Sequence, residues 1–334
     1  MIIKNWPVLT FVAGYHLLLL LLLPWFIMDF SWTAAAFFLV TYIIGGLSIT
    51  AGYHRLFSHK TYTARPVFEW LILIGSTLAV QWTALVWSHD HRLHHKHVDT
   101  DKDPYSIKRG FLYAHMLWLF VDKRDFNPAV VPDLMKNPRV MFQHQYYLPL
   151  MLVTNLAVVL LACLFLHPIT ALVAAFLLRV FAIHHSTWFI NSLAHTWGAK
   201  TYVRELSAMD NAVLAFLTFG EGYHNFHHAF AGDYRNGVRW WHFDPTKWLV
   251  MASARLGLVK DLRTVNPMRL QQALLDKDKT LLLKHLNSFQ DETAQEIGRK
   301  LEDLAHQFES QSAALRQRYT ELKKATAIRR EDRK

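Results

Sequence analysis

Histidine is the residue type in this chain whose number and spacing are best suited to chemistry. The chain has 20 histidines in 334 residues. Two clusters have the spacing i, i+3, i+4, which places three imidazoles on one face of a helix. A third pair is separated by five residues, a step that fits the end of a helix better than its interior. The members are His54 and His59, then His91, His94 and His95, then His224, His227 and His228, with His195 four residues after Asn191.

These clusters predict a metal centre. Protonated imidazoles that are crowded together repel one another, whereas neutral imidazoles can share a bound metal ion. The nine imidazoles exceed the four ligands of one zinc site and could serve two metals of higher coordination number. Imidazole suits iron, zinc, copper and nickel, and the set lacks the Glu-x-x-His pairs of soluble di-iron bundles. We therefore expect a nearly all-nitrogen pair of metals.

Other motifs narrow the cofactor chemistry. The sequence contains no G-x-G-x-x-G or P-loop pattern, which argues against a bound flavin or dinucleotide. Its single cysteine, Cys163, excludes a disulfide framework and any cysteine-based zinc or iron–sulfur site. A pair of redox metals without such a cofactor indicates activation of O₂ with electrons from an external donor.

The remaining histidines are expected to have other roles. A polar pair inside an apolar span is costly, so His184 and His185 are candidates for additional ligands. His89 and His97 flank the second cluster and could support it or face solvent. Surface or hydrogen-bonded core positions are expected for His16, His115, His144, His242, His285 and His306.

Long apolar runs predict the elements that must carry the clusters. Hydrophobic residues make up 52% of the chain and charged residues only 19%, which excludes a disordered chain and favours a membrane protein. About 20 apolar residues cross the hydrocarbon core of a bilayer. Four runs qualify as spans, at about 9–28, 32–53, 146–166 and 169–190. A fifth run, 67–88, carries polar residues, and we expect it to be interfacial or buried without crossing.

The distribution of basic residues predicts the orientation. Residues 54–145 carry twelve Lys and Arg and residues 196–334 carry twenty-two, whereas the links 28–32 and 166–169 carry none. By the positive-inside rule, the two links face outward and every histidine cluster lies on the cytoplasmic side. The sequence thus predicts an all-α membrane protein, with four transmembrane helices in two hairpins and a cytoplasmic helical cap that holds the metal site.

Charge and link length also bear on location and partners. The net charge of +10 fits a protein that faces an anionic membrane surface, and we expect no nucleic-acid partner. The short outer links favour a bacterial inner membrane, with an endoplasmic reticulum membrane as the alternative. We expect a membrane domain over residues 1–268 and a charged helical tail over 269–334. Imperfect heptads in the tail predict an amphipathic helix that packs on the body or on a partner.

Five runs resemble the membrane-bound fatty acyl desaturases, and most closely their delta-9 branch, which includes the animal stearoyl-CoA desaturases. The resemblance covers about residues 30–260 and rests on GLSITAGYHRLFSH, WSHDHRLHHKHVDTDKDPY, RGFLYAHMLWLF, TWFINSLAH and GEGYHNFHHAFAGDYR. It implies a di-iron enzyme that removes two hydrogens from adjacent methylenes of a saturated acyl chain. The reaction would use O₂ and two electrons and yield a cis double bond and water.

The resemblance also implies roles for individual residues. A kinked apolar tunnel would present the methylene pair to the irons, and Trp82, Trp87 and Trp188 are candidates to line it. The implied iron ligands are His54, His59, His91, His94, His95, His195, His224, His227 and His228, with Asn191 acting through a water molecule. The resemblance does not divide these ligands between the two irons.

The chain departs from the animal enzymes where they bind coenzyme A. At two positions that are basic in those enzymes it has His89 and Asp122. Lys123 and Arg124 directly follow Asp122 and are candidate substrate-binding residues. Acyl-CoA is the expected form of the long-chain substrate, and an acyl-phospholipid is the alternative. Because no His-Pro-Gly-Gly motif of a fused cytochrome occurs, electrons should come from a separate ferredoxin or cytochrome with its reductase.

Two other functions are consistent with part of the pattern. A fatty acyl hydroxylase on the same scaffold would also begin by abstracting hydrogen, so histidine clusters alone do not separate it from a desaturase. A histidine-rich metal transporter would place its ligands near the middle of the bilayer. Here the clusters lie at span ends or in cytoplasmic segments, which favours the enzyme.

Overall fold

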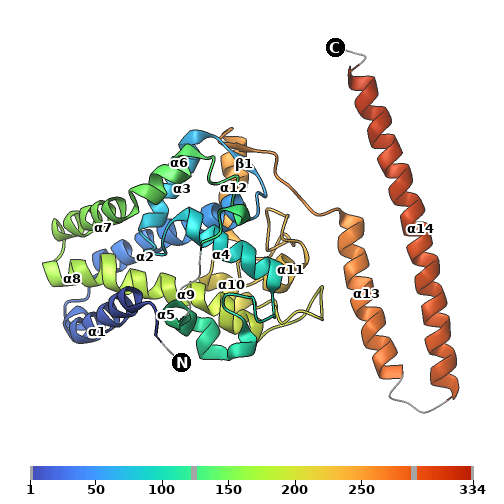
Figure 1. Ribbon diagram of the computed structural model, residues 1–334, viewed down its shortest axis with the longest axis horizontal. Coiled ribbons are helices and arrows are strands. Elements are labelled where there is room, and N and C mark those ends of the chain that lie inside the picture. The colour runs from blue at the N-terminus through green and yellow to red at the C-terminus, as the bar shows by residue number, and fades with distance from the viewer. Residues whose placement is uncertain (1–2, 122–125, 287–291, 332–334) are drawn as a thin grey trace. The chain divides into compact units, whose positions relative to one another are not determined.

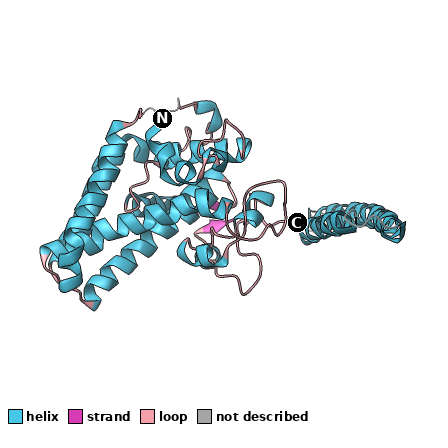
Figure 2. Ribbon diagram, turned by 90° about the horizontal axis from the view of Figure 1, so that it is seen from below, coloured by secondary structure: helices cyan, strands magenta, loops and turns pink. Residues whose placement is uncertain are grey.

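The computed structural model describes residues 3–121, 126–286 and 292–331. The chain divides into two units, Met1–Thr264 and Val265–Lys334. Helices predominate in the described residues, and the two short strands β1 (Thr63–Ala64) and β2 (Val259–Lys260) pair antiparallel (Figures 1 and 2).

Three helical stretches are long and apolar enough to cross a membrane. The first is α1 (Trp6–Met28), with 23 residues. The second joins α2 (Trp32–Leu47) to the π-helix η1 (Ser48–Ser58), and together they have 27 residues. The third covers 28 residues and consists of α8 (Pro168–Leu172), η5 (Val173–Leu178), α9 (Arg179–Ser192) and η6 (Leu193–His195). At about 1.5 Å per residue, each exceeds a hydrocarbon core of about 30 Å.

The second and third stretches are longer than the predicted spans 32–53 and 169–190. The second continues to Ser58 although it includes Arg55, because that guanidinium is buried and paired with Glu221 and Asp244. The third continues to His195. In both cases polar side chains that would end a span on solvent instead find partners inside the protein.

The predicted span 146–166 corresponds to α7 (Tyr147–Cys163), which has 17 residues. It is preceded by α6 (Pro138–Gln145), and the two helices are bent by 78° at their junction. By length and composition, this bent pair qualifies as a fourth candidate span only if it is counted as one.

The run 67–88 does not form one long helix. α3 (Pro66–Thr77) has 12 residues, too few to cross, and α4 (Ala84–His97) begins after a turn. Side chains from other helices satisfy the carbonyls of this turn. Arg179 donates to Leu78, His184 Nε2 lies 3.0 Å from the Ala79 oxygen, and the Tyr53 hydroxyl donates to Trp82. Buried irregular backbone needs such partners.

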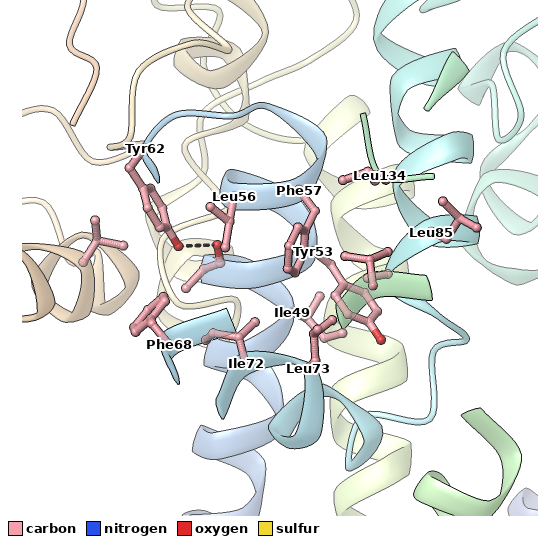
Figure 3. Close-up of a cluster of buried hydrophobic side chains, with 14 of the residues drawn as sticks. Ile49, Tyr53, Leu56, Phe57, Tyr62, Phe68, Ile72, Leu73, Leu85 and Leu134 are labelled. Carbon is pink, nitrogen blue, oxygen red and sulfur yellow. Dashed lines mark hydrogen bonds between the residues drawn. The ribbon is translucent and has the colours of Figure 1, made fainter. Parts of the chain in front are cut away.

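A buried cluster packs η1, α3 and α4 against one another (Figure 3). Tyr53, Phe57 and Leu56 come from η1, Ile72 and Leu73 from α3, and Leu85 from α4. The Tyr62 hydroxyl also donates to the Ala51 carbonyl at 2.7 Å (Figure 3). This packing fixes the first and second histidine clusters relative to each other.

Short elements complete the first unit. α11 (His224–Ala229) carries the third histidine cluster and lies beside α4 (Figure 1). The others are η2 (Ile107–Arg109), η3 (Tyr113–Leu117), α5 (Trp118–Val121), η4 (Pro128–Val130), α10 (Ala212–Leu217) and α12 (Pro245–Arg255).

The second unit consists of α13 (Pro267–Leu286) and α14 (Glu292–Glu331), which pack on each other. Ile297, Leu304, Phe308 and Leu315 on α14 are exposed. Leu322, which continues the seven-residue spacing of Leu301, Phe308 and Leu315, lies outside the residues whose side chains are described.

Candidate metal centre

The structure gathers all nine predicted histidines into two groups. Within each group the potential ligand atoms lie within 4.8 Å of one another. The first group is His54, His59, His91, His95 and His227, and the second is His94, His195, His224 and His228. The sequence left this division open, and packing decides it.

Helix geometry explains how each cluster divides. On α4, His91 and His95 are four residues apart and join the five-histidine group, whereas His94 joins the other. On α11 the i, i+4 pair His224 and His228 joins the four-histidine group. Each helix therefore contributes two histidines to one group and one histidine to the other, because adjacent positions differ by about 100° around the axis.

The five-residue step between His54 and His59 lies at a helix end, as expected, because η1 ends at Ser58 and His59 is its C-cap residue. η1 is π-helical, and its hydrogen bonds join residue i to i+5. The His59 N–H donates to the His54 carbonyl at 3.1 Å, so the two residues are one π-helical turn apart. The unusual spacing is therefore the signature of a π-helix, a form often found at functional sites.

The Nε2 atoms of both groups point inward. In the five-histidine group, His59 and His91 have Nε2 atoms 2.7 Å apart, and His227 Nε2 lies 2.9 Å from His95 Nε2. In the four-histidine group, His224 Nε2 lies 3.0 Å from His195 Nε2 and 3.1 Å from His228 Nε2. Inward-facing nitrogens at this density are better stabilised by a cation than by one another.

Three rings have an outer nitrogen within 3.0 Å of an oxygen atom. His54 Nδ1 lies 2.7 Å from Glu221 Oε2, and His94 Nδ1 lies 2.9 Å from Asp103 Oδ1. His195 Nδ1 lies 2.6 Å from the hydroxyl of Ser207. A proton held on Nδ1 leaves the Nε2 lone pair free for a metal, which is the usual support of metal-bound histidine. These donor sets therefore fit two metal ions.

Sequence reasoning missed these supporting residues. Glu221 and Asp103 stand inside the runs GEGYHNFHH and DTDKDPY, so a carboxylate close to each cluster was visible. Ser207 could not be identified from the sequence, because its position beside His195 depends on the fold of a loop. Its hydroxyl also donates to Asp99 in that arrangement.

Burial disfavours the charged form of several of the clustered imidazoles. Desolvation lowers the pKa of His91 and His227 well below the ordinary value, and the neighbouring His54 and His59 lower it further. The pKa of His95 and of His228 is lowered for the same two kinds of cause. Neutral imidazoles keep the lone pairs that a metal requires.

A buried ion network supports the five-histidine group. Arg55 Nη2 lies 2.9 Å from Glu221 Oε1 and 3.0 Å from Asp244 Oδ1. Burial alone would raise the pKa of Glu221, but His54 and Arg55 outweigh it and lower that pKa. Asp244 also accepts the Lys247 N–H at the start of α12. The network thus ties η1, α12 and the segment before α11 together.

An apolar cavity reaches both groups. Its volume is about 590 Å³, and His54, His94 and His224 are among its lining residues. The three predicted tunnel residues, Trp82, Trp87 and Trp188, line it, as does Asn191. Gln81 crosslinks two parts of the wall, since it donates to Thr187 at 2.8 Å and accepts from the Trp87 indole at 3.3 Å.

Other predicted positions lie elsewhere. Lys123 and Arg124 are outside the described residues, as is Asp122. His184 and His185 belong to neither histidine group. His89 is buried, with Nδ1 2.9 Å from Asp90 Oδ1 and Nε2 accepting the Asn127 N–H.

The fold and the site define a helical protein with candidate membrane spans and two histidine-rich metal groups. A sequence model of the fatty acid desaturase family matches residues 30–260. The chain belongs to this family.

Curated relatives give the same result. The chain is 38% identical over 250 residues to "Acyl-CoA desaturase 1" of Saccharomyces cerevisiae, a match that covers 73% of this chain and 48% of the relative. It is 35% identical over 270 residues to "Delta(9)-fatty-acid desaturase fat-6" of Caenorhabditis elegans, covering 78% and 79%. It is 36% identical over 236 residues to "Stearoyl-CoA desaturase 2" of Mus musculus, covering 67% and 65%. The chain spans about half the length of the Saccharomyces cerevisiae relative and of "Probable acyl-CoA desaturase" of Schizosaccharomyces pombe, which it also matches.

Proposed function

We propose that this protein is an oxygen-dependent acyl-CoA desaturase that introduces a cis double bond, at the delta-9 position, into a saturated long chain. The observation that carries the proposal is the apolar cavity of about 590 Å³ that reaches both histidine groups. An apolar cavity with a few polar groups at one end suits an acyl chain whose reacting carbons lie beside metals. The names of the relatives in yeast, worm and mouse support this substrate class.

The nine histidines would hold two irons, five around one and four around the other, with Asn191 completing the second through water. Bound iron supplies the oxidising power that an unactivated C–H bond requires. The protein's own residues orient the imidazoles, keep them neutral and enclose the acyl chain in a dry cavity. Two hydrogens of the substrate, O₂, two electrons and two protons balance against two waters and the alkene.

The topology that we propose has four spans in two hairpins. α7 and the bent α6 would supply the fourth, and α3 would enter the membrane without crossing it. This places the histidine groups and the short helices around them in a cap on the cytoplasmic face. Short outer links agree with a bacterial inner membrane, and the eukaryotic source of the relatives keeps the endoplasmic reticulum as the alternative.

A separate one-electron carrier, a ferredoxin or a cytochrome with its reductase, would supply the electrons. Acyl-CoA is the proposed substrate form, and acyl-phospholipid is the alternative. Lys123 and Arg124 are proposed to bind the polar end of the substrate.

The test is expression of the full chain in a host that cannot make unsaturated lipids. New delta-9 cis fatty acids, with two irons per chain in the purified protein, are expected. Hydroxylated products on mass spectrometry would indicate a hydroxylase, and metal uptake without any modified fatty acid would indicate a transporter. Purified enzyme supplied in parallel with acyl-CoA or acyl-phospholipid separates the two substrate forms.

A further inference from the structure

A second set of histidines forms a linear chain away from both metal groups. His16 Nε2 on α1 lies 3.0 Å from His185 Nε2 on α9. His185 Nδ1 lies 3.0 Å from His115 Nε2 on η3, and His115 Nδ1 lies 3.0 Å from the Ser192 hydroxyl on α9. At the His16 end of this set, His16 Nδ1 lies 2.7 Å from the Val12 carbonyl oxygen.

The carbonyl of Val12 sets the directions of the bonds between the three histidine rings. A carbonyl only accepts, so His16 Nδ1 must carry the proton and Nε2 of the neutral ring must accept. His185 then donates from Nε2 and accepts at Nδ1. His115 in turn donates from Nε2, and its Nδ1 competes with the Trp188 carbonyl for the single hydroxyl proton of Ser192, since Ser192 Oγ lies 3.0 Å from both acceptors. When that proton points to His115, all six ring nitrogens are satisfied while all three rings stay neutral.

The opposite assignment of donors and acceptors fails at the Val12 carbonyl. It would place the lone pair of His16 Nδ1 against the lone pairs of the Val12 oxygen. The Val12 carbonyl also argues against a proton relay. A helix carbonyl has no proton to pass on, so a proton that moved along the three histidines could not leave at this end. The chain is therefore better suited to holding elements together than to moving protons.

A parallel bond strengthens the link between α1 and α9. The Tyr15 hydroxyl lies 3.1 Å from His184 Nδ1, and His184 Nε2 faces the Ala79 carbonyl in the turn after α3. Consecutive residues of α1, Tyr15 and His16, thus bond consecutive residues of α9, His184 and His185. Between helices in lipid there is little hydrophobic driving force, so such bonds carry much of the specificity of packing.

These two helices form part of the wall of the apolar cavity. Val8, Phe11 and Val12 of α1 line it, and so do His184 and Trp188 of α9. Trp188 is packed against the chain, with its ring centroid 5.0 Å from that of His185 and 5.8 Å from that of His115.

We propose that the chain His16–His185–His115–Ser192 locks α1 and η3 onto α9 and so fixes the cavity wall that selects the acyl chain. His16, His185 and His115 are positioning residues in this proposal, since they act through Val12 and Trp188. The part that concerns acyl selection rests on the proposed function, whereas the lock itself does not.

The lock is tested on the full-length protein by a double-mutant cycle of His16→Leu and His185→Leu. The effect of the double substitution on the unfolding equilibrium constant should differ from the product of the two single effects by roughly threefold. This is the average for hydrogen bonds between helices in membranes. The exposed His306 gives the control, since His306→Leu should be additive with His185→Leu. Additive behaviour of His16 and His185 would overturn the lock. If a leucine variant does not fold, the cycle is run with alanine at both positions.

Nitrogen-15 spectra of histidine-labelled, iron-free protein test the direction of the chain. The His16 signal, identified by its loss in His16→Leu, should report a proton on Nδ1, and the His185 signal a proton on Nε2. A proton on His16 Nε2 with His185 protonated on Nδ1 would reject the assignment. This measurement does not depend on catalysis.

Acyl selection is tested with an equimolar mixture of saturated acyl-CoA lengths. His185→Leu should broaden the distribution of product lengths while iron per chain stays unchanged. His185→Gln, which keeps one donor and one acceptor, should restore much of the selectivity. Loss of iron in His185→Leu, or an unchanged product distribution, would overturn the role in the cavity wall. If wild-type protein makes no product from any length, the proposed function fails, and the coupling and tautomer results still decide the lock.

Discussion

Glu221 lies 2.7 Å from His54 through one carboxylate oxygen, while its other oxygen lies 2.9 Å from the guanidinium of Arg55. One buried side chain thus orients a proposed iron ligand and balances the charge of the neighbouring residue in η1. This double role predicts that Glu221 matters for metal binding as much as some of the histidines do.

Replacing Glu221 by Gln should weaken iron binding. The amide cannot hold the Nδ1 proton of His54 as a carboxylate does, and loss of such a support typically lowers metal affinity about 10- to 100-fold. Iron retained against increasing concentrations of a chelator measures the effect. The exposed Glu205→Gln is the matched control and should retain iron like the wild type. Equal retention in Glu221→Gln and the control would show that His54 is oriented by other contacts.

A single replacement in either histidine group should abolish turnover. His95→Ala removes a member of the five-histidine group and His228→Ala a member of the four-histidine group. Each should abolish turnover, and His94→Ala and His227→Ala should do the same, while all four variants still insert because insertion depends on the apolar spans. Iron analysis and product formation are the measurements, with His97→Ala as the control. Wild-type product from two or more of these variants would contradict the di-iron assignment.

Arg179 should be needed for stability. It is fully buried, donates from Nε to the Ala175 carbonyl at 2.8 Å, and also bonds the Leu78 carbonyl and the side-chain oxygen of Asn155. Arg179→Met leaves buried acceptors without donors, at a cost of about 1–3 kcal/mol for each. Thermal unfolding in detergent should show the loss, and the exposed Arg65→Met should show little. A wild-type melting temperature for Arg179→Met would mean that the turn finds other donors.

Asp133 predicts a pH-dependent contribution to stability. Burial raises its pKa, but hydrogen bonds from Arg92 and Lys60 outweigh this and bring the pKa to about 2. A depressed carboxylate pKa stabilises the fold above the unfolded value of about 3.9, and this stability is lost as the pH falls toward about 2. Because the side chain is one-third exposed, we expect less than about 1 kcal/mol.

The measurement is thermal unfolding of iron-free wild type and Asp133→Asn over a range of pH. The difference between the two proteins should be largest at neutral pH and should shrink as the pH falls from about 4 to about 2. Asp101→Asn, at an exposed position, is the control. A difference that grows in acid would contradict the assigned direction.

The turn after α3 should keep the segment beyond α4 on the cytoplasmic side. A cysteine at the exposed Lys102, in a Cys163→Ser background, should react only with thiol reagents that reach the cytoplasm. Labelling by an impermeant reagent from outside would overturn the four-span topology.

Several features of the site were predictable from the sequence alone, because they depend on local spacing. The i, i+3, i+4 pattern of His91, His94 and His95 sets their directions around one helix. Apolar runs near 20 residues predicted the long helices, since the thickness of a bilayer sets their length. Composition and the runs around the histidines also indicated the family, which the comparison confirmed.

Other features depend on contacts between segments far apart in the chain, and only the tertiary structure decides them. Spacing cannot show that His94 joins His228 while its neighbour His95 joins His227, because that depends on how α4 packs against α11. The π-helix around His54, the carboxylate of Glu221 on its outer nitrogen and the chain through His185 arise in the same way. The direction of a side chain follows from its own helix, but long-range packing determines which residue it contacts.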